Sequence, residues 1–304
     1  MCGIVGLFSK SPEMSAQLGR HLGAMLAQMA SRGPDSAGVA IYRDPVAAGE
    51  TKLCLFSEDP HYGWGALCDE LRTVLGCEGE PEVRVSHALI VVDGPAGAAQ
   101  AWLREHHPEL RVMSAGETIE IYKEKGNPEE FVTRFNLAEL AGTHALGHTR
   151  MATESAVTTE HSHPFSTGLD LCLVHNGSLS NHNDLRRELI RNGIHFDTDN
   201  DTEVAAGYLT WRLREGASLE EALESCLDAL DGFYTFAVGT HDGFAVLRDP
   251  FACKPAVLAE TDDWVAMASE YRAIAILPGA AGANVWEPAP GVLYSWRREA
   301  ALVP

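Results

Sequence analysis

The chain has 304 residues, which is enough for one large domain or two small ones with a sizeable apolar core. Its composition is 45% hydrophobic and 22% charged, as in an ordinary soluble globular protein. The formal net charge of −20 argues against a nucleic-acid-binding surface, because no basic stripe is available to neutralise phosphates.

The seven cysteines are scattered and none forms a Cys-x-x-Cys pair, so the sequence predicts neither a disulfide framework nor a zinc knuckle. The N-terminus lacks a basic region followed by an apolar stretch. No run reaches the roughly 18 apolar residues that cross a bilayer. We therefore expect a cytoplasmic protein that does not contact a membrane.

In the first half of the chain, residues 2–8 form a short apolar run that predicts a strand at the very terminus. Apolar residues then recur at helical spacing over 18–29, and Gly33 predicts the end of that helix. The stretch 51–140 fits the pattern least well, with a helix expected at 98–107 and strands near 83–92 and 117–123. We expect it to be an inserted subdomain folded against the main body.

In the second half, residues 171–175 predict a buried strand, and the Asn176-Gly177 dipeptide predicts a turn after it. A helix should follow and end at Gly193, and another should follow residues 199–201. Ser218 and Glu221 form a capping box that predicts a third helix. Short apolar runs then predict antiparallel strands at 234–239, 244–247, 256–259, 264–268 and 292–296.

Cys2 is the first residue in the chain that could take part in catalysis. If the initiator methionine is trimmed, the residue carries a free α-amine beside a thiol. Their reference pKa values of about 7.7–8.0 and about 8.5 make proton transfer between them nearly balanced at neutral pH. One residue would then supply both nucleophile and general base. The alternative is an ordinary buried cysteine on a first strand.

Two arginines stand in recognisable segments. Arg32 lies in the Ser-Arg-Gly-Pro-Asp-Ser turn, and Arg150 lies in Gly-His-Thr-Arg. If Arg150 is buried it needs an anionic partner, either a substrate carboxylate held bidentately or a structural ion pair. The pair His161 and His163 has no third ligand at suitable spacing, so no metal site is predicted.

Two further segments carry polar groups next to expected element ends. An Asn176 amide and a Gly177 backbone N–H can point two donors at one developing oxyanion, although a plain hairpin turn is the commoner meaning of this dipeptide. Asp201, at an expected helix start, can hold an ammonium group or simply cap the helix.

Taken in order, these segments resemble the glutaminase domain of class II glutamine amidotransferases. The resemblance extends through the segment from His161 to Phe165 and the late strands, and so covers nearly the whole chain apart from the insertion. It implies an α+β fold, a four-layer α-β-β-α sandwich of the N-terminal-nucleophile hydrolase type. The chain would be a single domain over 2–304 with the inserted subdomain at about 51–140.

The resemblance also implies catalytic roles. Cys2 would be the nucleophile, its own α-amine the base, and ammonia would leave through a thioester. Asn176 and the backbone N–H of Gly177 would form the oxyanion hole.

The substrate-binding residues implied by the resemblance are Arg150 for the glutamine α-carboxylate and Asp201 for its α-ammonium, with Thr153 and Arg32 in the same group. Arg32 would also support the nucleophile strand. Many relatives carry Arg-Trp-Ala-Thr-His at the Arg150 segment, whereas this chain has Arg-Met-Ala-Thr-Glu. That difference should alter how the pocket closes and its local charge.

The chain ends where the glutaminase domain should end, so the expected ammonia acceptor is a separate synthase subunit. Chains of this size resemble the small amidotransferase-like subunit of N-methylglutamate synthase. That subunit joins glutamate-synthase-like partners carrying flavin and iron–sulfur centres, and no cofactor is expected in this chain itself. Two alternatives stay open: a non-catalytic or regulatory subunit that binds glutamate or glutamine, and a hydrolase acting on another amide.

Overall fold

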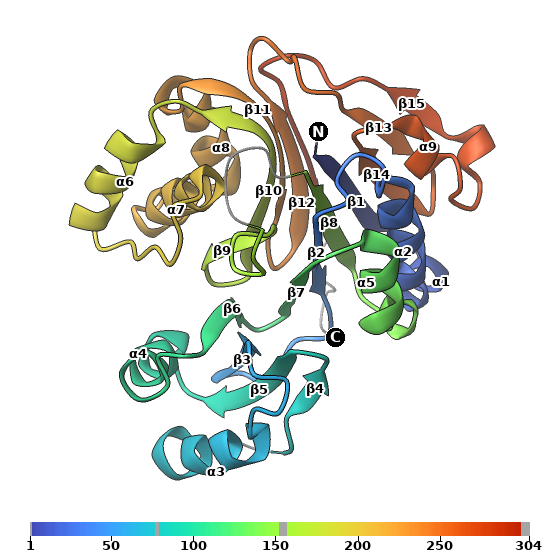
Figure 1. The fold of residues 1–304 in the computed structure, drawn as a ribbon. Coiled ribbons are helices and arrows are strands. Elements are labelled where there is room, and N and C mark those ends of the chain that lie inside the picture. Colours follow the sequence, from blue (N-terminus) through green and yellow to red (C-terminus); the bar gives the residue numbers. More distant parts are fainter. Residues whose placement is uncertain (1, 77–78, 152–156, 299–304) are drawn as a thin grey trace, which may run out of the picture.

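The computed structural model describes residues 2–76, 79–151 and 157–298. Two β-sheets lie face to face, with one group of helices outside each sheet, as Figure 1 shows. Helix α7 contacts β9 and β10 on one side, and helix α2 contacts β1 and β8 on the other. This confirms the predicted α+β class and the four-layer α-β-β-α sandwich.

The first sheet has seven strands and holds the N-terminus at its centre. Its order is β15 (Asn284–Trp286), β13 (Val257–Glu260), β14 (Trp264–Ala268), β1 (Gly3–Ser9), β8 (His144–Arg150), β2 (Ser36–Tyr42) and β7 (Ile119–Lys125). Every residue of β1 is buried, because the sheet covers both edges of the strand and the helices and second sheet cover its faces. The covering helices are α1 (Pro12–Ala16), α2 (Leu18–Gln28), α5 (Pro128–Arg134) and α9 (Tyr271–Ile274).

The second sheet has five strands, in the order β16 (Leu293–Arg297), β12 (Gly243–Arg248), β11 (Gly232–Gly239), β10 (Leu171–Leu179) and β9 (Phe165–Gly168). Its outer helices are α6 (His182–Arg191), α7 (Asp201–Arg214) and α8 (Leu219–Ala229). The capping box at Ser218 and Glu221 is present at the start of α8, as predicted. Within the described ranges, no helix is both long enough and apolar enough to cross a bilayer.

The predicted turn at Asn176-Gly177 is wrong. Strand β10 continues through both residues to Leu179 and stays paired with β11, with Leu179 opposite Gly232. The tertiary pairing therefore overrides the local turn preference of the dipeptide. The late strands occur where the sequence predicts them, but they divide between the two sheets, with β13 and β14 in the first.

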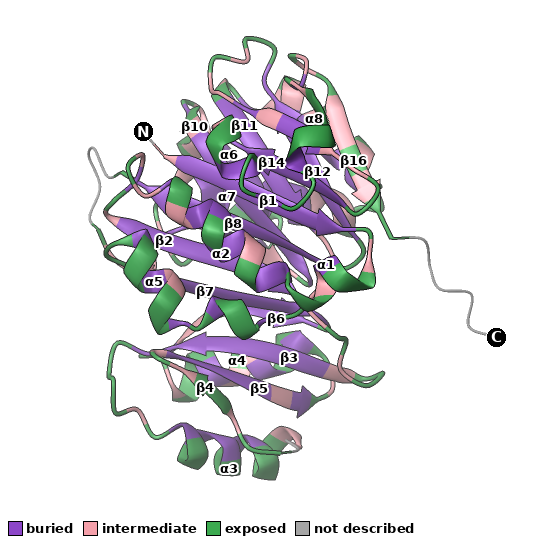
Figure 2. Cartoon of the chain, turned by 90° about the vertical axis from the view of Figure 1, so that its right-hand side faces the viewer, coloured by how far each residue is buried: buried purple, intermediate pink, exposed green. Residues whose placement is uncertain are grey.

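The inserted unit has its own sheet and its own apolar core, seen below the main body in Figures 1 and 2. The sheet order is β4 (Glu82–Arg84), β5 (His87–Asp93), β3 (Glu50–Phe56) and β6 (Arg111–Gly116), with helices α3 (Trp64–Leu75) and α4 (Ala96–His106) packed on it. The sequence predicts an inserted unit that extends to about residue 140, and the structure corrects this limit. Strand β7 pairs with β2 in the first sheet and α5 packs on α2, so the separate unit ends near Gly116.

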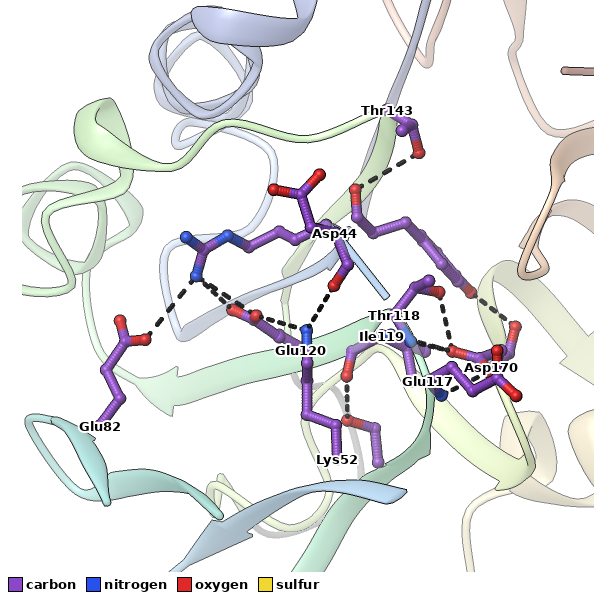
Figure 3. Close-up of polar contacts among 12 residues, drawn as sticks. Asp44, Lys52, Glu82, Glu117, Thr118, Ile119, Glu120, Thr143 and Asp170 are labelled. Carbon is purple, nitrogen blue, oxygen red and sulfur yellow. Dashed lines mark hydrogen bonds and ion pairs between the residues drawn. The ribbon is translucent and has the colours of Figure 1, made fainter. Parts of the chain in front are cut away.

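Buried charges join this unit to the main body (Figure 3). Glu120 on β7 is 1% exposed, and its carboxylate contacts Lys52 of the inserted unit at 3.2 Å and Arg43 at 3.3 Å. Nearby, the carboxylate of Asp170 accepts the backbone N–H groups of Glu117, Thr118 and Ile119 at 2.7–2.9 Å, and also the Thr118 hydroxyl. One side chain from the turn between β9 and β10 thus fixes the turn that leads from the inserted unit into β7.

Replacing Asp170 by alanine should lower the free energy of unfolding by about 3 kcal/mol, because the substitution leaves several buried donors without an acceptor. Asp170→Asn should cost less, since one carbonyl oxygen remains. Urea unfolding of both variants measures this, with the exposed Asp184→Asn as control. Equal stability of Asp170→Ala and the wild-type protein would contradict the assigned role.

Candidate active site

A cavity of about 380 Å³ lies where the start of β1, the end of β8, the middle of β10 and the start of α7 come together. Four residues predicted from the sequence line it: Cys2, Arg150, Gly177 and Asp201. They are separated by up to 199 positions in the chain, so only the folded structure brings them to one place. Three larger hollows, of about 890, 790 and 400 Å³, contain none of these residues, and the first two are both lined by Lys10.

Cys2 sits immediately before β1, and its carbonyl oxygen is held from two directions. Arg32 Nε donates to it at 3.0 Å, and Asn176 Nδ2 donates to it at 3.3 Å. The Arg32 guanidinium also pairs with Glu270 at 2.6 Å. Arg32 is not among the residues that line the cavity. The structure therefore places its guanidinium behind Cys2, where it supports the start of β1.

Gly177 is required by the close packing of β10 against its neighbours. A Cβ atom at this position would lie 2.0 Å from the Phe233 carbonyl oxygen and 2.6 Å from His175 Nε2, and the φ angle is +156°. Asn176, one position earlier, is 3% exposed and directs its amide nitrogen to the Cys2 carbonyl. The Asn-Gly pair thus lies beside Cys2 within a continuous strand.

Asp201 is the first residue of α7, but it is not the helix cap. Asn200 takes that role, and its side chain accepts the Thr202 N–H at 2.9 Å. Asp201 Oδ2 instead accepts the Leu179 N–H at 3.0 Å, and Oδ1 lies 3.7 Å from His175 Nδ1. Burial acts to raise the pKa of Asp201, but the His175 imidazole and the Leu179 N–H outweigh it and lower the pKa to about 2. The carboxylate is therefore anionic at neutral pH and faces the cavity.

Arg150 ends β8, is 6% exposed and lines the same cavity as Asp201. Among its described residues, the cavity wall thus has one arginine and two carboxylates, Asp201 and the exposed Asp199, which pairs with His161 at 3.0 Å. A cation and an anion in one cavity match the two charges of a free amino acid. Met151, which stands where many relatives have tryptophan, also lines the cavity and is 47% exposed. Thr153 and Glu154 lie outside the described residues.

Sequence reasoning missed a group of imidazoles in the cavity wall: His161, His163, His175 and His182. His175 Nε2 is buried with no hydrogen-bond partner among the described residues. The sequence places His161 and His163 in the segment that carries the family resemblance, but it gives their rings no role beyond an incomplete metal motif. Across the described residues, no group of three or more His, Cys, Asp or Glu side chains is arranged to hold a metal ion.

The His163 ring is packed in the interior of the wall. It stacks on His148 with centroids 4.0 Å apart. Burial, with further contributions from His148, His175 and Arg150, lowers the pKa of His163 well below its usual value, and burial lowers that of His148 to about 3. Both rings are therefore neutral at physiological pH and act through hydrogen bonds and packing.

Comparison with known proteins agrees with this site. A protein-family model described as a glutamine amidotransferase domain matches residues 148–276. The chain is 52% identical to the glutamine amidotransferase-like protein GlxB of Rhizobium meliloti, over 99% of this chain and 100% of that one. It is 32% identical to a putative glutamine amidotransferase of Methanothermobacter thermautotrophicus, over 89% and 92% of the two chains.

Among solved structures, the glutamine phosphoribosylpyrophosphate amidotransferase of B. subtilis has a similar fold. Its TM-score is 0.60 at 20% identity, and the match covers 99% of this chain and 50% of that chain. The end-to-end similarity to two amidotransferase-like proteins, together with the fold and the site, identifies the family. The chain belongs to the class II glutamine amidotransferases.

Proposed function

We propose that this protein hydrolyses the side-chain amide of glutamine through a thioester on Cys2 and delivers the ammonia to a separate synthase subunit. The observation that carries the proposal is the shared cavity. It places a terminal-strand cysteine beside Asn176 and Gly177, with Arg150 and the ionised Asp201 in the same wall.

The chemistry requires removal of Met1, which leaves Cys2 with a free α-amine. The thiol passes its proton to this amine as the sulfur attacks the amide carbon of glutamine. The carbonyl oxygen becomes an oxyanion, to which the Asn176 amide and the Gly177 backbone N–H donate. The C–N bond then breaks, the amine returns the proton to the leaving ammonia, and water hydrolyses the thioester to glutamate and free Cys2.

Two charged side chains select a free amino acid as substrate. Arg150 pairs with the α-carboxylate, and Asp201 with the α-ammonium, so the amide end of glutamine is directed to Cys2. Met151 lines this end of the pocket. The family resemblance adds Thr153 to the substrate-binding residues.

The ammonia acceptor is a glutamate-synthase-like partner of the kind found in N-methylglutamate synthase, where flavin and iron–sulfur centres belong to the partner subunits. The matched proteins differ in what accompanies the part that this chain matches. Half of the B. subtilis amidotransferase lies beyond the part that this chain matches, whereas GlxB is matched over its whole length. Co-purification of the chain with such subunits from its own cells tests this assignment, and a fully active lone monomer would contradict it.

Asp201→Asn should raise the KM for glutamine by about 10- to 100-fold, because a hydrogen bond to a charged group contributes about 1.5–3 kcal/mol. The amide keeps an oxygen that can accept the Leu179 N–H, so the fold should be retained. Steady-state glutaminase assays measure the change, with the exposed Asp228→Asn as matched control on another helix. An unchanged KM would remove Asp201 from the substrate site.

The proposed substrate class is tested by ammonia release from glutamine, 4-aminobutanamide and glutaramic acid. The second compound lacks the α-carboxylate and the third lacks the α-ammonium. We expect hydrolysis of glutamine at a kcat/KM at least about 100-fold higher than for either analogue, the loss that follows when a buried charged group is left unpaired. Comparable turnover of all three would favour a hydrolase of other amides. Glutamine binding without hydrolysis, in the mature chain with its partners, would favour a regulatory subunit.

A further inference from the structure

Lys123 on β7 has an amine buried outside the cavity. The side chain is 4% exposed, and Nζ donates to the carbonyl oxygens of Glu160, Ser162 and Pro164 at 3.1, 2.9 and 3.3 Å. A lysine ammonium has three N–H donors, so all of them are used on one short turn. Strand β7 is the edge of the first sheet next to the inserted unit (Figure 1), and the turn leads into β9 of the second sheet.

A buried lysine is unusual, because a charge removed from water is costly unless it is paired. Among the described residues, no carboxylate forms an ion pair with Lys123, and its Nζ lies over the Phe165 ring, 4.5 Å from the centroid. Burial lowers the pKa of Lys123 to about 8, against the opposing effect of Glu203, Asp197 and Glu160. Among the described residues, the hydrogen bonds of the amine thus all go to backbone carbonyl oxygens.

The turn is packed too closely to shift freely. A Cβ atom on Gly38 of β2 would lie 2.1 Å from the His163 carbonyl oxygen and 2.6 Å from Lys123 Cβ. Ser162, at the centre of the turn, is fully buried, and its hydroxyl donates to the Thr158 carbonyl at 2.8 Å. The position of His163 is therefore set by Lys123 on one side and β2 on the other.

His163 connects the two halves of the glutamine pocket. Its Nδ1 accepts the backbone N–H of His175 at 3.3 Å, so the neutral ring carries its proton on Nε2. That nitrogen lies 3.2 Å from Thr202 Oγ1, to which it donates. His175 directly precedes Asn176 on β10, and Thr202 directly follows Asp201 on α7. The His163 imidazole thus bridges β10, which carries the oxyanion donors, and α7, which carries the ammonium-binding carboxylate.

We propose that Lys123 is a positioning residue for glutamine binding: by holding the turn of residues 160–164, it fixes His163 and thereby the spacing between Asn176 on β10 and Asp201 on α7. The proposal rests on the proposed function only in taking the cavity as a glutamine site. Lys123 itself does not contact the cavity and transfers no proton.

The test measures glutamine binding by isothermal titration calorimetry in a Cys2→Ala background, where hydrolysis cannot interfere. Lys123→Met should raise the Kd for glutamine about 10-fold or more, because a small misplacement of binding groups costs up to about 100-fold in comparable sites. Lys125→Met is the matched control, since Lys125 lies two residues further along the same strand with an exposed side chain, and it should leave the Kd unchanged.

Calorimetry separates positioning from a purely structural role, because the binding stoichiometry reports the folded fraction and the Kd reports the site. A lowered stoichiometry with an unchanged Kd would overturn the proposal. If Lys123→Met does not fold, Lys123→Gln is the test variant, because its amide keeps two N–H donors. It should raise the Kd for glutamine about 3-fold or more. An unchanged Kd in this variant would overturn the proposal. Failure of the Cys2→Ala parent to bind glutamine would instead refute the proposed function.

Discussion

Cys2→Ala should reduce glutamine hydrolysis by on the order of 10⁶-fold, the loss seen when the nucleophile of a covalent mechanism is removed. Among the described residues that line the cavity, Cys2 and Met151 are the two that contain sulfur. The substitution therefore removes the only thiol among them and leaves the thioether of Met151. The backbone carbonyl of Cys2 remains, so its hydrogen bonds to Arg32 and Asn176 are retained and the fold should be unchanged.

The matched control is Cys253→Ala, because Cys253 is a free and exposed cysteine away from the cavity. Its variant should hydrolyse glutamine at the wild-type rate. Ammonia release from the mature chains, with thermal unfolding in parallel, measures both. Substantial hydrolysis by a correctly folded Cys2→Ala chain would contradict the covalent mechanism.

The second large effect is expected at Asn176. Asn176→Ala removes one of the two oxyanion donors and should lower kcat by about 100- to 1,000-fold with a smaller change in KM, because the donor acts mainly on the charge that develops in the transition state. Asn176→Asp should lower it further, since a carboxylate beside the oxyanion repels it. Steady-state kinetics of both variants test this.

Asn192→Ala is the control for Asn176, because Asn192 lies at the exposed end of α6 and its amide donates only to the Glu188 carbonyl. Reaction of Cys2 with an electrophilic glutamine analogue should persist in Asn176→Ala, which separates a lost oxyanion donor from a collapsed pocket. A change confined to KM would show that Asn176 binds the ground state of the substrate instead.

The sequence predicts much of this fold because many of its signals are local. The apolar run at the N-terminus becomes β1, and the capping box at Ser218 starts α8. Gly193 lies just past the end of α6 with φ +77°, as a helix stop requires. The chemistry at Cys2, Gly177 and Asp201 is recognised for a different reason: the ordered set of motifs resembles a family, whereas each motif alone has a commoner structural meaning.

The errors arise where long-range contacts decide the outcome. Asn176-Gly177 has the local signature of a hairpin, yet pairing with β11 keeps it in a strand. Strand β7 follows the inserted unit directly in the chain, and only its pairing with β2 assigns it to the main sheet. His163 was missed as a structural link for the same reason, because its partners come from β10 and α7, which lie 12 and 39 residues further along the chain.

The Arg32 and Lys123 side chains show why the supporting residues of a site are harder to predict than its reactive ones. Both act through backbone carbonyls: Arg32 on Cys2, and Lys123 on the turn of residues 160–164. A carbonyl has no residue-specific sequence signature, so no spacing rule indicates such a contact. The reactive residues, by contrast, are restricted to the few side chains that can perform the chemistry.

The proposed function requires that Cys2 is a mature nucleophile in a glutamine-shaped pocket. Intact mass of the purified chain, before and after treatment with an electrophilic glutamine analogue, tests it most directly, with Cys2→Ala treated in parallel. We expect loss of Met1 and a single adduct that maps to Cys2, prevented by excess glutamine and absent from Cys2→Ala. A chain that retains Met1, or a mature Cys2 that stays unlabelled with its partners present, would contradict the account and favour a binding role for the same fold.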